Sequence, residues 1–311
     1  MRRNSILKLA MGCFLSVAAS FAATDAHSQT APIAATPNGQ GSVNGVYGYI
    51  ANNSVEALST PDAIMSAAAQ GTPTLVWETL EHAEKVECLS CISFVAPLLY
   101  DANAKNREIA AWWLRRRVFG VFGPGEVYSQ TVQTLQTDSD PVKRSYAAYA
   151  LGEFFAAPGI LACASALVTD GDARVRAAAA SALGRLNSDG GGALGQAMSD
   201  SDPSVRLAVL ASAGRVNTFS SAGALAALTT DSSSDVRRRA IEIIDQLVVK
   251  DALTPVAAAA QNDTDARVRA VACHALGSIG NSSVTSLLTN LSQNDPDAFV
   301  RDQATIALMR L

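Results

Sequence analysis

Two stretches of this sequence decide its fold: Asp170-Gly-Asp-Ala-Arg-Val-Arg-Ala-Ala-Ala-Ala-Ser-Ala-Leu-Gly184 and Asp263-Thr-Asp-Ala-Arg-Val-Arg-Ala-Val-Ala-Cys-His-Ala-Leu-Gly277. In each, an Arg follows the first Asp after six residues, and small or apolar residues recur three, four, six and seven positions after that Arg. These offsets lie on one face of an α-helix. We therefore predict a helix after each Asp-containing loop. We also predict a left-handed C-cap at the closing glycines, Gly152, Gly184 and Gly277.

The same spacing of Asp and Arg occurs seven times along the chain. The pairs are Asp101/Arg107, Asp138/Arg144, Asp170/Arg176, Asp200/Arg206, Asp231/Arg237, Asp263/Arg269 and Asp295/Arg301. Successive arginines are separated by 37, 32, 30, 31, 32 and 32 residues. A second short helix follows each Arg-bearing helix, as at residues 192–198, and a period near 31 residues with two helices per unit predicts a solenoid. We expect this Asp/Arg ladder to be structural and to fix the stacking of the units.

The two quoted stretches resemble HEAT repeats of the short, phycobilisome-lyase-like type, and the resemblance covers residues 101–311. It implies an all-α fold, an α-solenoid of HEAT-like helix pairs with about seven repeats and N-terminal capping helices. The same repeat type includes deoxyhypusine hydroxylase, whose di-iron ligands are His-Glu pairs directly after the Arg of the repeat. This chain contains no His-Glu pair, so the resemblance implies no iron site here. A lyase-like activity has no comparable motif and stays open as an alternative.

Composition agrees with closely packed helices and excludes several functions. Of 311 residues, 57 are alanine, 49% are hydrophobic and 6% are aromatic, which favours helices over a β-sandwich. The formal net charge is −4, so we expect no nucleic-acid partner.

The first 28 residues are predicted to be a signal peptide. The start is basic, and residues 9–23 carry no charge but are too few to cross a bilayer. The sequence Ala26-His27-Ser28 indicates cleavage near Ser28, with cleavage after Ala22 as the alternative. We therefore expect an exported protein, periplasmic or secreted, with no transmembrane span in the mature chain.

Two segments lie between the signal peptide and the repeats. Residues 29–59 are rich in Ala, Asn, Gly, Ser and Thr, which predicts a flexible linker or arm. Within it, the apolar residues 46–50 could dock onto the body of the protein. Residues 60–100 show helical spacing and contain a Cys-x-x-Cys motif, so we predict N-terminal capping helices there.

The Cys-x-x-Cys pair, Cys88 and Cys91, is the one compact reactive signature. A structural zinc ion would need two more ligands, and only His82 lies nearby. The residue after the pair is not the histidine that c-type haem attachment needs. We therefore predict no metal, no cofactor and a disulfide in an oxidising compartment, with thiol exchange as the alternative. Cys163 and Cys273 occupy core positions and are predicted to be inert thiols.

The remaining chemistry favours binding over catalysis. No nucleophile, Walker or Rossmann motif is present, so we assign no catalytic residue. Trp112 and Tyr149 stand five positions after their ladder arginines, opposite the core face, and Arg116 follows one turn beyond Trp112. Since Trp, Tyr and Arg are favoured at interface centres, we predict a non-catalytic scaffold that binds another protein across residues 100–155. The N-terminal helices and the 29–59 arm could instead cover Trp112.

The alternative function belongs to another class. It is a redox or enzyme-accessory protein, lyase-like or thiol-based, centred on Cys88, Cys91 and the first repeat.

Overall fold

The computed structural model describes residues 42–45, 48–51, 58–120, 123–156, 158–187 and 189–311. The chain divides into two compact units, with the boundary after residue 52. The described residues of the first unit form an antiparallel hairpin of β1 (Ser42–Gly45) and β2 (Gly48–Ala51). The predicted signal peptide, residues 1–28, and the first part of the predicted linker lie outside the described residues.

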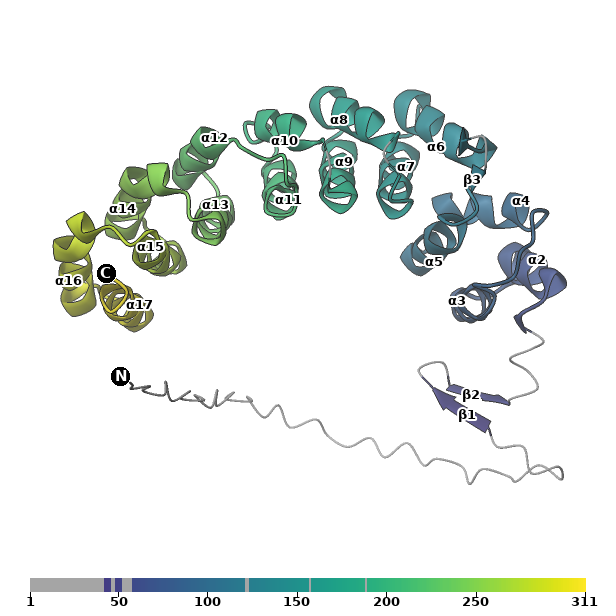
Figure 1. Cartoon of the computed structure of the whole chain (residues 1–311), viewed down its shortest axis with the longest axis horizontal. Helices are drawn as coiled ribbons and strands as arrows, with labels where there is room; N and C mark the ends of the chain where they lie inside the picture. Colours follow the sequence, from purple (N-terminus) through teal and green to yellow (C-terminus); the bar gives the residue numbers. More distant parts are fainter. Residues whose placement is uncertain (1–41, 46–47, 52–57, 121–122, 157, 188) are drawn as a thin grey trace, which may run out of the picture. The chain divides into compact units, whose positions relative to one another are not determined.

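The second unit is a row of helix pairs in two layers, and the inner layer lies on the hollow side of the row (Figure 1). The outer layer contains α2 (Pro61–Gln70), α4 (Ile92–Val95) with η1 (Ala96–Tyr100), α6 (Glu126–Thr137), α8 (Gly159–Thr169), α10 (Gly191–Ala197), α12 (Ala222–Ala227) with η2 (Leu228–Thr230), η3 (Lys250–Ala252) with α14 (Leu253–Asn262), and η4 (Ser282–Val284) with α16 (Thr285–Asn294). The inner layer contains α3 (Pro73–His82), α5 (Ala104–Leu114), α7 (Pro141–Glu153), α9 (Ala173–Leu186), α11 (Pro203–Ala213), α13 (Ser234–Leu247), α15 (Ala266–Ile279) and α17 (Ala298–Leu308). The predicted all-α solenoid of helix pairs is confirmed.

A short hairpin is inserted between α5 and α6. Its strands are β3 (Phe119–Gly120) and β4 (Gly123–Pro124), which pair antiparallel. It lies where the spacing of the ladder arginines rises to 37 residues, so the extra residues of the first interval contain this hairpin.

The helix pairs differ in phase from the sequence prediction. Each inner helix packs against the outer helix that precedes it, as α9 does against α8 and α15 against α14. The prediction grouped each Arg-bearing helix with the helix after it, and assigned residues 92–100 to the capping helices. In the structure, α4 and η1 contact α5 and form the outer layer of the first repeat, which leaves α2 and α3 as the N-terminal pair. The Asp-containing loop is therefore the tight turn inside a pair.

The predicted C-caps at three glycines are wrong, because these residues lie inside helices. They are Gly152 in α7, Gly184 in α9 and Gly277 in α15. A Cβ atom added to Gly277 would lie 2.8 Å from the Cα atom of Ala307 in the next inner helix. Glycine is needed there for the close approach of two backbones. The left-handed residue of α15 comes three positions later, at Gly280.

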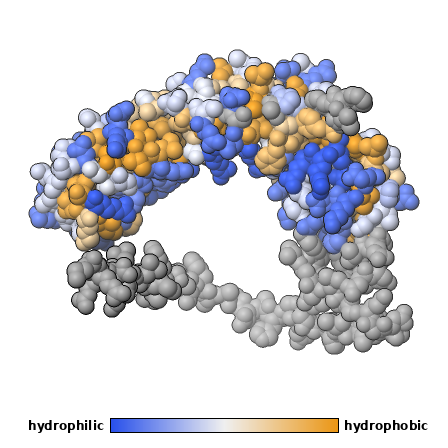
Figure 2. Space-filling view, in the orientation of Figure 1, coloured by the Kyte–Doolittle hydropathy of each residue, from blue (hydrophilic) through white to orange (hydrophobic). Residues whose placement is uncertain are grey.

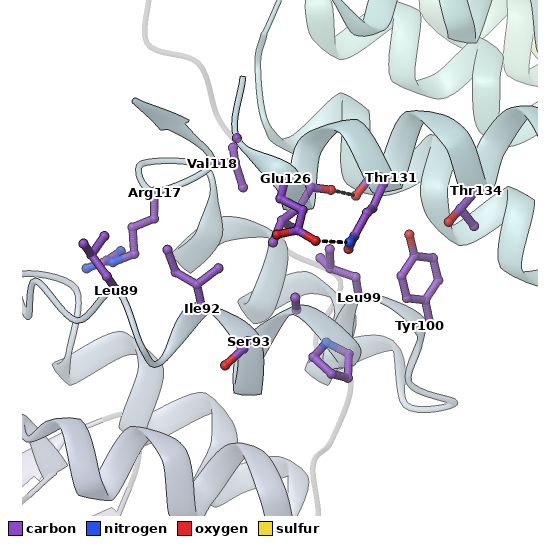
Figure 3. Close-up of a pocket in the computed structure, with 15 residues that line it drawn as sticks. Leu89, Ile92, Ser93, Leu99, Tyr100, Arg117, Val118, Glu126, Thr131 and Thr134 are labelled. Carbon is purple, nitrogen blue, oxygen red and sulfur yellow. Dashed lines mark hydrogen bonds between the residues drawn. The ribbon is translucent and has the colours of Figure 1, made fainter. Parts of the chain in front are cut away.

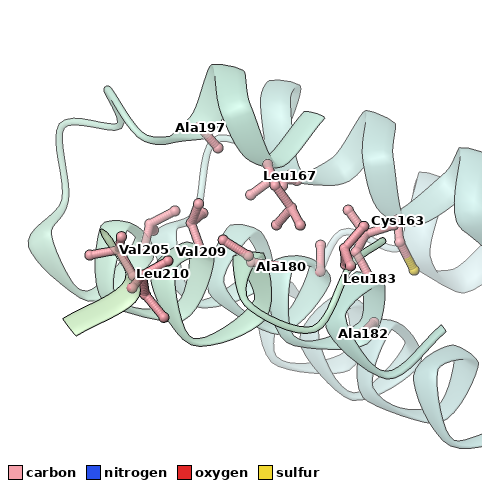
Figure 4. Close-up of a cluster of buried hydrophobic side chains, with 14 of the residues drawn as sticks. Cys163, Leu167, Ala180, Ala182, Leu183, Ala197, Val205, Val209 and Leu210 are labelled. Carbon is pink, nitrogen blue, oxygen red and sulfur yellow. The ribbon is translucent and has the colours of Figure 1, made fainter. Parts of the chain in front are cut away.

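The core is an apolar layer between the two rows of helices. Figure 4 shows Cys163 and Leu167 of α8 facing Ala180 and Leu183 of α9, and all four are buried. Small alanines beside leucines let neighbouring helices pack closely. Burial raises the pKa of the Cys163 thiol to about 12. The predicted core position of Cys163 is confirmed, and the raised pKa favours the protonated thiol at neutral pH.

Candidate protein-binding surface

Five of the seven ladder arginines join successive repeats. Each of these five pairs with the Asp of the next repeat rather than with the Asp six residues before it. The pairs have N–O distances of 2.6–2.8 Å: Arg144–Asp170, Arg176–Asp200, Arg206–Asp231, Arg237–Asp263 and Arg269–Asp295. The Asp of the same repeat supplies its backbone carbonyl instead, as Asp170 does to Nη1 of Arg176 at 2.9 Å. Each of these guanidinium groups therefore binds the Asp-containing loop of its own repeat and the Asp-containing loop of the next repeat.

Each ladder carboxylate also shapes the loop that contains it. Oδ1 of Asp170 accepts the backbone N–H of Asp172 at 2.9 Å, and Asp172 in turn caps α9 by accepting the N–H of Arg174 at 2.9 Å. Burial raises the pKa of Asp170, but hydrogen bonds from Arg144 and from the Asp172 N–H outweigh it, so the net pKa is lowered. The sequence analysis found the first Asp of this Asp-x-Asp pattern and missed the capping role of the second.

The last ladder arginine, Arg301 on α17, corrects the prediction that every member of the ladder fixes the stacking of repeats. Its Nη1 donates to the backbone carbonyls of Asp295 and Pro296 at 2.7 and 3.2 Å, so it holds the loop of its own repeat. Within the part of the chain that the structure describes, no carboxylate pairs with Arg301. In the five ion-paired members of the ladder, the pairing runs forward along the chain, from each Arg to an Asp 24–26 residues later.

The first ladder arginine, Arg107, is the second exception; its link to the next repeat is the first rung of the ladder. Nη1 of Arg107 donates to the carbonyls of Asp101 and Ala102 at 2.6 and 2.9 Å, as in the later repeats. In the described part of the chain, however, no ion pair joins Arg107 to Asp138 of the next repeat. The ring of Tyr146 lies against the guanidinium instead, 3.8 Å from its carbon atom.

A cavity of about 270 Å³ opens on the inner layer beside this rung. Its lining comes from α5, α7 and α9 and includes Arg107, Tyr146, Tyr149 and Arg174. Tyr149 was predicted to bind a partner. It is half-buried, and the guanidinium of Arg185 lies 5.0 Å from its ring. Burial raises the pKa of Tyr149, so its hydroxyl keeps its proton and can donate a hydrogen bond at neutral pH.

The other two predicted binding residues are placed differently. Trp112 is half-buried against the core rather than fully outward. The guanidinium of Arg115, not that of Arg116, lies 5.6 Å from the Trp112 ring, and the same group is 5.9 Å from the ring of Phe155. Arg116 pairs with Glu84 just beyond α3 at 2.8 Å. Arg116 therefore contacts the N-terminal helix pair.

Seven residues on or directly after the inner helices α5, α7 and α9 form what we call the aromatic–arginine surface. They are Arg107, Trp112, Arg115, Tyr146, Tyr149, Phe155 and Arg185. Figure 2 shows hydrophilic side chains gathered on the inner side at α5. Phe155 is 55% exposed and adopts a left-handed φ of 50°. Five members of this surface were not predicted as such from the sequence: Arg107, Arg115, Tyr146, Phe155 and Arg185. One signal was available, because Tyr146 occupies an offset at which the next two repeats have alanine.

A larger groove of about 630 Å³ lies between α4–η1 and α6 (Figure 3). Leu89 and Arg117 lie at one end, and Tyr100 and Thr134 lie at the other. The guanidinium of Arg117 donates to the backbone carbonyls of Trp113, Glu84 and Val86 at 2.6–2.9 Å. Burial lowers the pKa of Arg117. The positive charge of Arg117 thus already holds the first repeat against the N-terminal helix pair.

Cys88 and Cys91 form a disulfide in the loop between α3 and α4, in agreement with the prediction. Both are buried, and Cys91 has no exposed surface. Thiol exchange needs a sulfur atom that an attacking thiolate can reach, so this geometry favours the structural interpretation over the redox alternative.

In the ranges that the structure describes, no helix is both long and apolar enough to cross a membrane.

Comparison with known proteins agrees with this architecture. Residues 129–191 and 221–309 match the family described as HEAT repeats. The crystal structure of YibA from Escherichia coli is 16% identical, with a TM-score of 0.55, and the match covers 83% of this chain and 96% of that one. Human deoxyhypusine hydroxylase, in complex with glycerol, is 20% identical over 83% of this chain and 98% of that one, with a TM-score of 0.35. The CpcE–CpcF complex of phycocyanin lyase from a Nostoc species is 20% identical over 71% and 94%, with a TM-score of 0.39.

No curated protein matches the sequence. The two stretches that match HEAT repeats, residues 129–191 and 221–309, both lie within the observed α-solenoid of helix pairs.

Proposed function

We propose that this protein is an exported, non-catalytic scaffold that binds another protein on the aromatic–arginine surface. The observation that carries the proposal is the concentration of Trp112, Tyr146, Tyr149 and Phe155 with stacked arginines on the inner layer of the first repeats. In a solenoid each unit packs against its neighbours, so the inner layer stays open along its length. Aromatic and Arg side chains dominate the binding energy of protein interfaces.

The position of this surface along the row also supports binding near the N-terminal end. The offset that holds Trp112 and Tyr149 in the first two repeats holds Ser181 and Ala211 in the next two. These small side chains are exposed but bury little area on association. Arginines stacked on aromatic rings are also partly ordered before a partner arrives, which lowers the entropy lost on binding.

Export is the second part of the proposal. The basic start, the uncharged residues 9–23 and the small residues Ala26 and Ser28 are typical of a signal peptide. The Cys88–Cys91 disulfide is consistent with an oxidising compartment. The test is the mass of the protein recovered from outside the cytoplasm of its native cells. Cleavage near Ser28 supports export, and an intact N-terminus on protein that stays in the cytoplasm contradicts it.

The binding function is tested by capture from the exported fraction, followed by affinity measurements with the purified partner. Trp112→Ala and Tyr149→Ala should each weaken binding by about 2 kcal/mol, which is roughly 30-fold. Ile306→Ala is the matched control, because Ile306 is exposed at the same offset on α17, and it should leave the affinity unchanged. Thermal melts followed by circular dichroism separate lost binding from lost folding. Equal affinity of all variants for every captured protein would refute the proposed surface.

A further inference from the structure

We infer that Arg107 is the receptor for a carboxylate that the bound partner supplies. This inference rests on the proposed function and names the chemistry that the partner offers. Arg107 and Arg301 are the two ladder arginines whose guanidinium groups form no ion pair with a described carboxylate. Of the two, Arg107 lies on the aromatic–arginine surface.

The occupied rungs show what a ladder arginine binds. In Arg144, Nε donates to Oδ2 of Asp170 at 2.8 Å and Nη2 donates to Oδ1 at 2.9 Å. Arg176 holds Asp200 with the same two nitrogens, at 2.6 and 2.9 Å. The planar fork of Arg matches a carboxylate in this bidentate arrangement.

The guanidinium of Arg107 is held through Nη1 in the same way, but its other two donor nitrogens, Nε and Nη2, have no partner among the described residues. Its Nη1 is fixed by the carbonyls of Asp101 and Ala102, just as Nη1 of Arg176 is fixed by the carbonyl of Asp170. Among the described residues, no hydrogen bond or ion pair engages Nε or Nη2 of Arg107. Asp138 has the position of the missing carboxylate in the sequence, and its Oδ1 accepts the N–H of Asp140 at 2.8 Å. The guanidinium is therefore oriented for a carboxylate that none of the described residues provides.

The structure gives a reason for the empty rung. The β3–β4 hairpin lengthens the first interval, and the ring of Tyr146 occupies the side of Arg107 that faces the second repeat. An aromatic residue stands at this offset only in the second repeat; the later repeats have Ala178, Ala208, Arg239, Val271 and Gln303 there, and the ladder arginine of the repeat before each of them is ion-paired. A ring on the face of a guanidinium leaves the in-plane N–H groups free to donate.

The surroundings select the ligand. The cavity of about 270 Å³ beside Arg107 has room for a side chain rather than for a folded element, and the rings of Tyr146 and Tyr149 line it. Arg174 also lines it but already pairs with Asp172 at 2.8 Å, and Glu108 is the acidic residue of the lining. The best match is an Asp or Glu of an extended partner segment, preceded by an aromatic side chain that packs on Tyr149.

The probe is a pair of capped dipeptides, acetyl-Tyr-Asp-amide and acetyl-Tyr-Asn-amide, which differ only in the charged group. Each is titrated into the wild-type protein while the Nε–Hε resonances of arginine are followed by NMR. The Asp peptide should shift the Arg107 resonance in a saturable way and leave that of Arg144 unchanged, because the fork of Arg144 is filled. Equal shifts with both peptides, or no saturable shift at tens of millimolar peptide, would overturn the inference.

Arg301 is a control for the contribution of the rings. Its fork is open as well, but the two tyrosines of the cavity belong to the first rung. The Asp peptide should therefore shift Arg301 less than Arg107 at the same concentration, and equal saturation at both would contradict selection by the cavity.

A variant adds a second readout. Arg107→Lys keeps the charge but removes the planar guanidinium fork. It should lower the affinity for the captured partner about tenfold, and it should abolish the preference for the Asp dipeptide over the Asn dipeptide. If Trp112→Ala lowers the affinity for the partner and Arg107→Lys does not, the proposed function stands and this inference fails. If the dipeptide binds Arg107 but Trp112→Ala and Tyr149→Ala leave the partner's affinity unchanged, the carboxylate site stands and the proposed function fails.

Discussion

Replacing Arg176 with alanine should lower the free energy of unfolding by about 3 kcal/mol. The side chain makes two hydrogen bonds to the carboxylate of Asp200, at 2.6 and 2.9 Å, and one to the carbonyl of Asp170 at 2.9 Å. Arg176 and Asp200 are 13% and 10% exposed, so Arg176→Ala leaves a mostly buried carboxylate without its cation. Breaking a fully buried pair costs about 3–5 kcal/mol, and the remaining water access places this pair at the lower end.

The matched control is Arg174→Ala, two residues earlier on the same helix. Arg174 also pairs with an Asp at 2.8 Å, but it is 63% exposed. Solvent screens a pair in that environment, so Arg174→Ala should change the free energy of unfolding far less than Arg176→Ala. Urea unfolding followed by circular dichroism at pH 7 measures both variants, and comparison of the slopes shows whether they unfold as cooperatively as the wild type.

A double-mutant cycle assigns the effect to the pair. If the pair joins the repeats as the structure shows, Asp200→Ala should add little to Arg176→Ala, because one interaction is removed by either change. Loss of less than about 0.5 kcal/mol in Arg176→Ala, or equal losses in Arg176→Ala and Arg174→Ala, would refute the view that the ladder stabilises the stacking.

Three further predictions concern the packing, the loops and the cysteines. Gly277→Ala should destabilise the protein by about 1–3 kcal/mol, since the added Cβ would lie 2.8 Å from the Cα of Ala307; Gly171→Ala, which meets nothing within 4 Å, should change stability little. Four ladder carboxylates, Asp170, Asp200, Asp263 and Asp295, have lowered pKa values, so their stabilisation is present above the unfolded pKa of about 3.9 and is lost as pH falls through the folded values; a urea midpoint that does not drop below pH 4 would contradict this. Intact mass without reductant should show Cys88 and Cys91 two hydrogens short, and two free thiols in freshly isolated protein would contradict the disulfide.

The repeated elements could be predicted from the sequence because seven copies show the same pattern. A single copy of Asp-x5-Arg carries little information, whereas recurrence at 30–32 residues over the last six arginines fixes the inner helices and their buried face. The direction of the pairing could not be predicted in this way. Arg176 is six residues from Asp170 in sequence, but its fork reaches Asp200 in the next repeat, and only the stacking geometry decides between the two.

The candidate surface was only partly predictable, because its members depend on where one repeat departs from the others. The offset rule placed Trp112 and Tyr149 opposite the core face, but it could not show that Trp112 is half-buried. Arg115 and Arg116 are adjacent in sequence, and only the fold directs one to Trp112 and the other to Glu84. The glycines were misassigned for a related reason: the end of a helix and a close helix contact both favour glycine.

Photo-crosslinking from position 149 tests the proposed binding surface most directly. Benzoylphenylalanine is placed at Tyr149 in one variant and at Ala211, the same offset on α11, in the other, and both are irradiated with the exported fraction. A binding surface on the first repeats predicts one discrete crosslinked protein from position 149, which is absent from position 211 and is lost when Trp112→Ala is added to a protein that still melts normally. Equal crosslinking from both positions, or a product that survives Trp112→Ala, would contradict it.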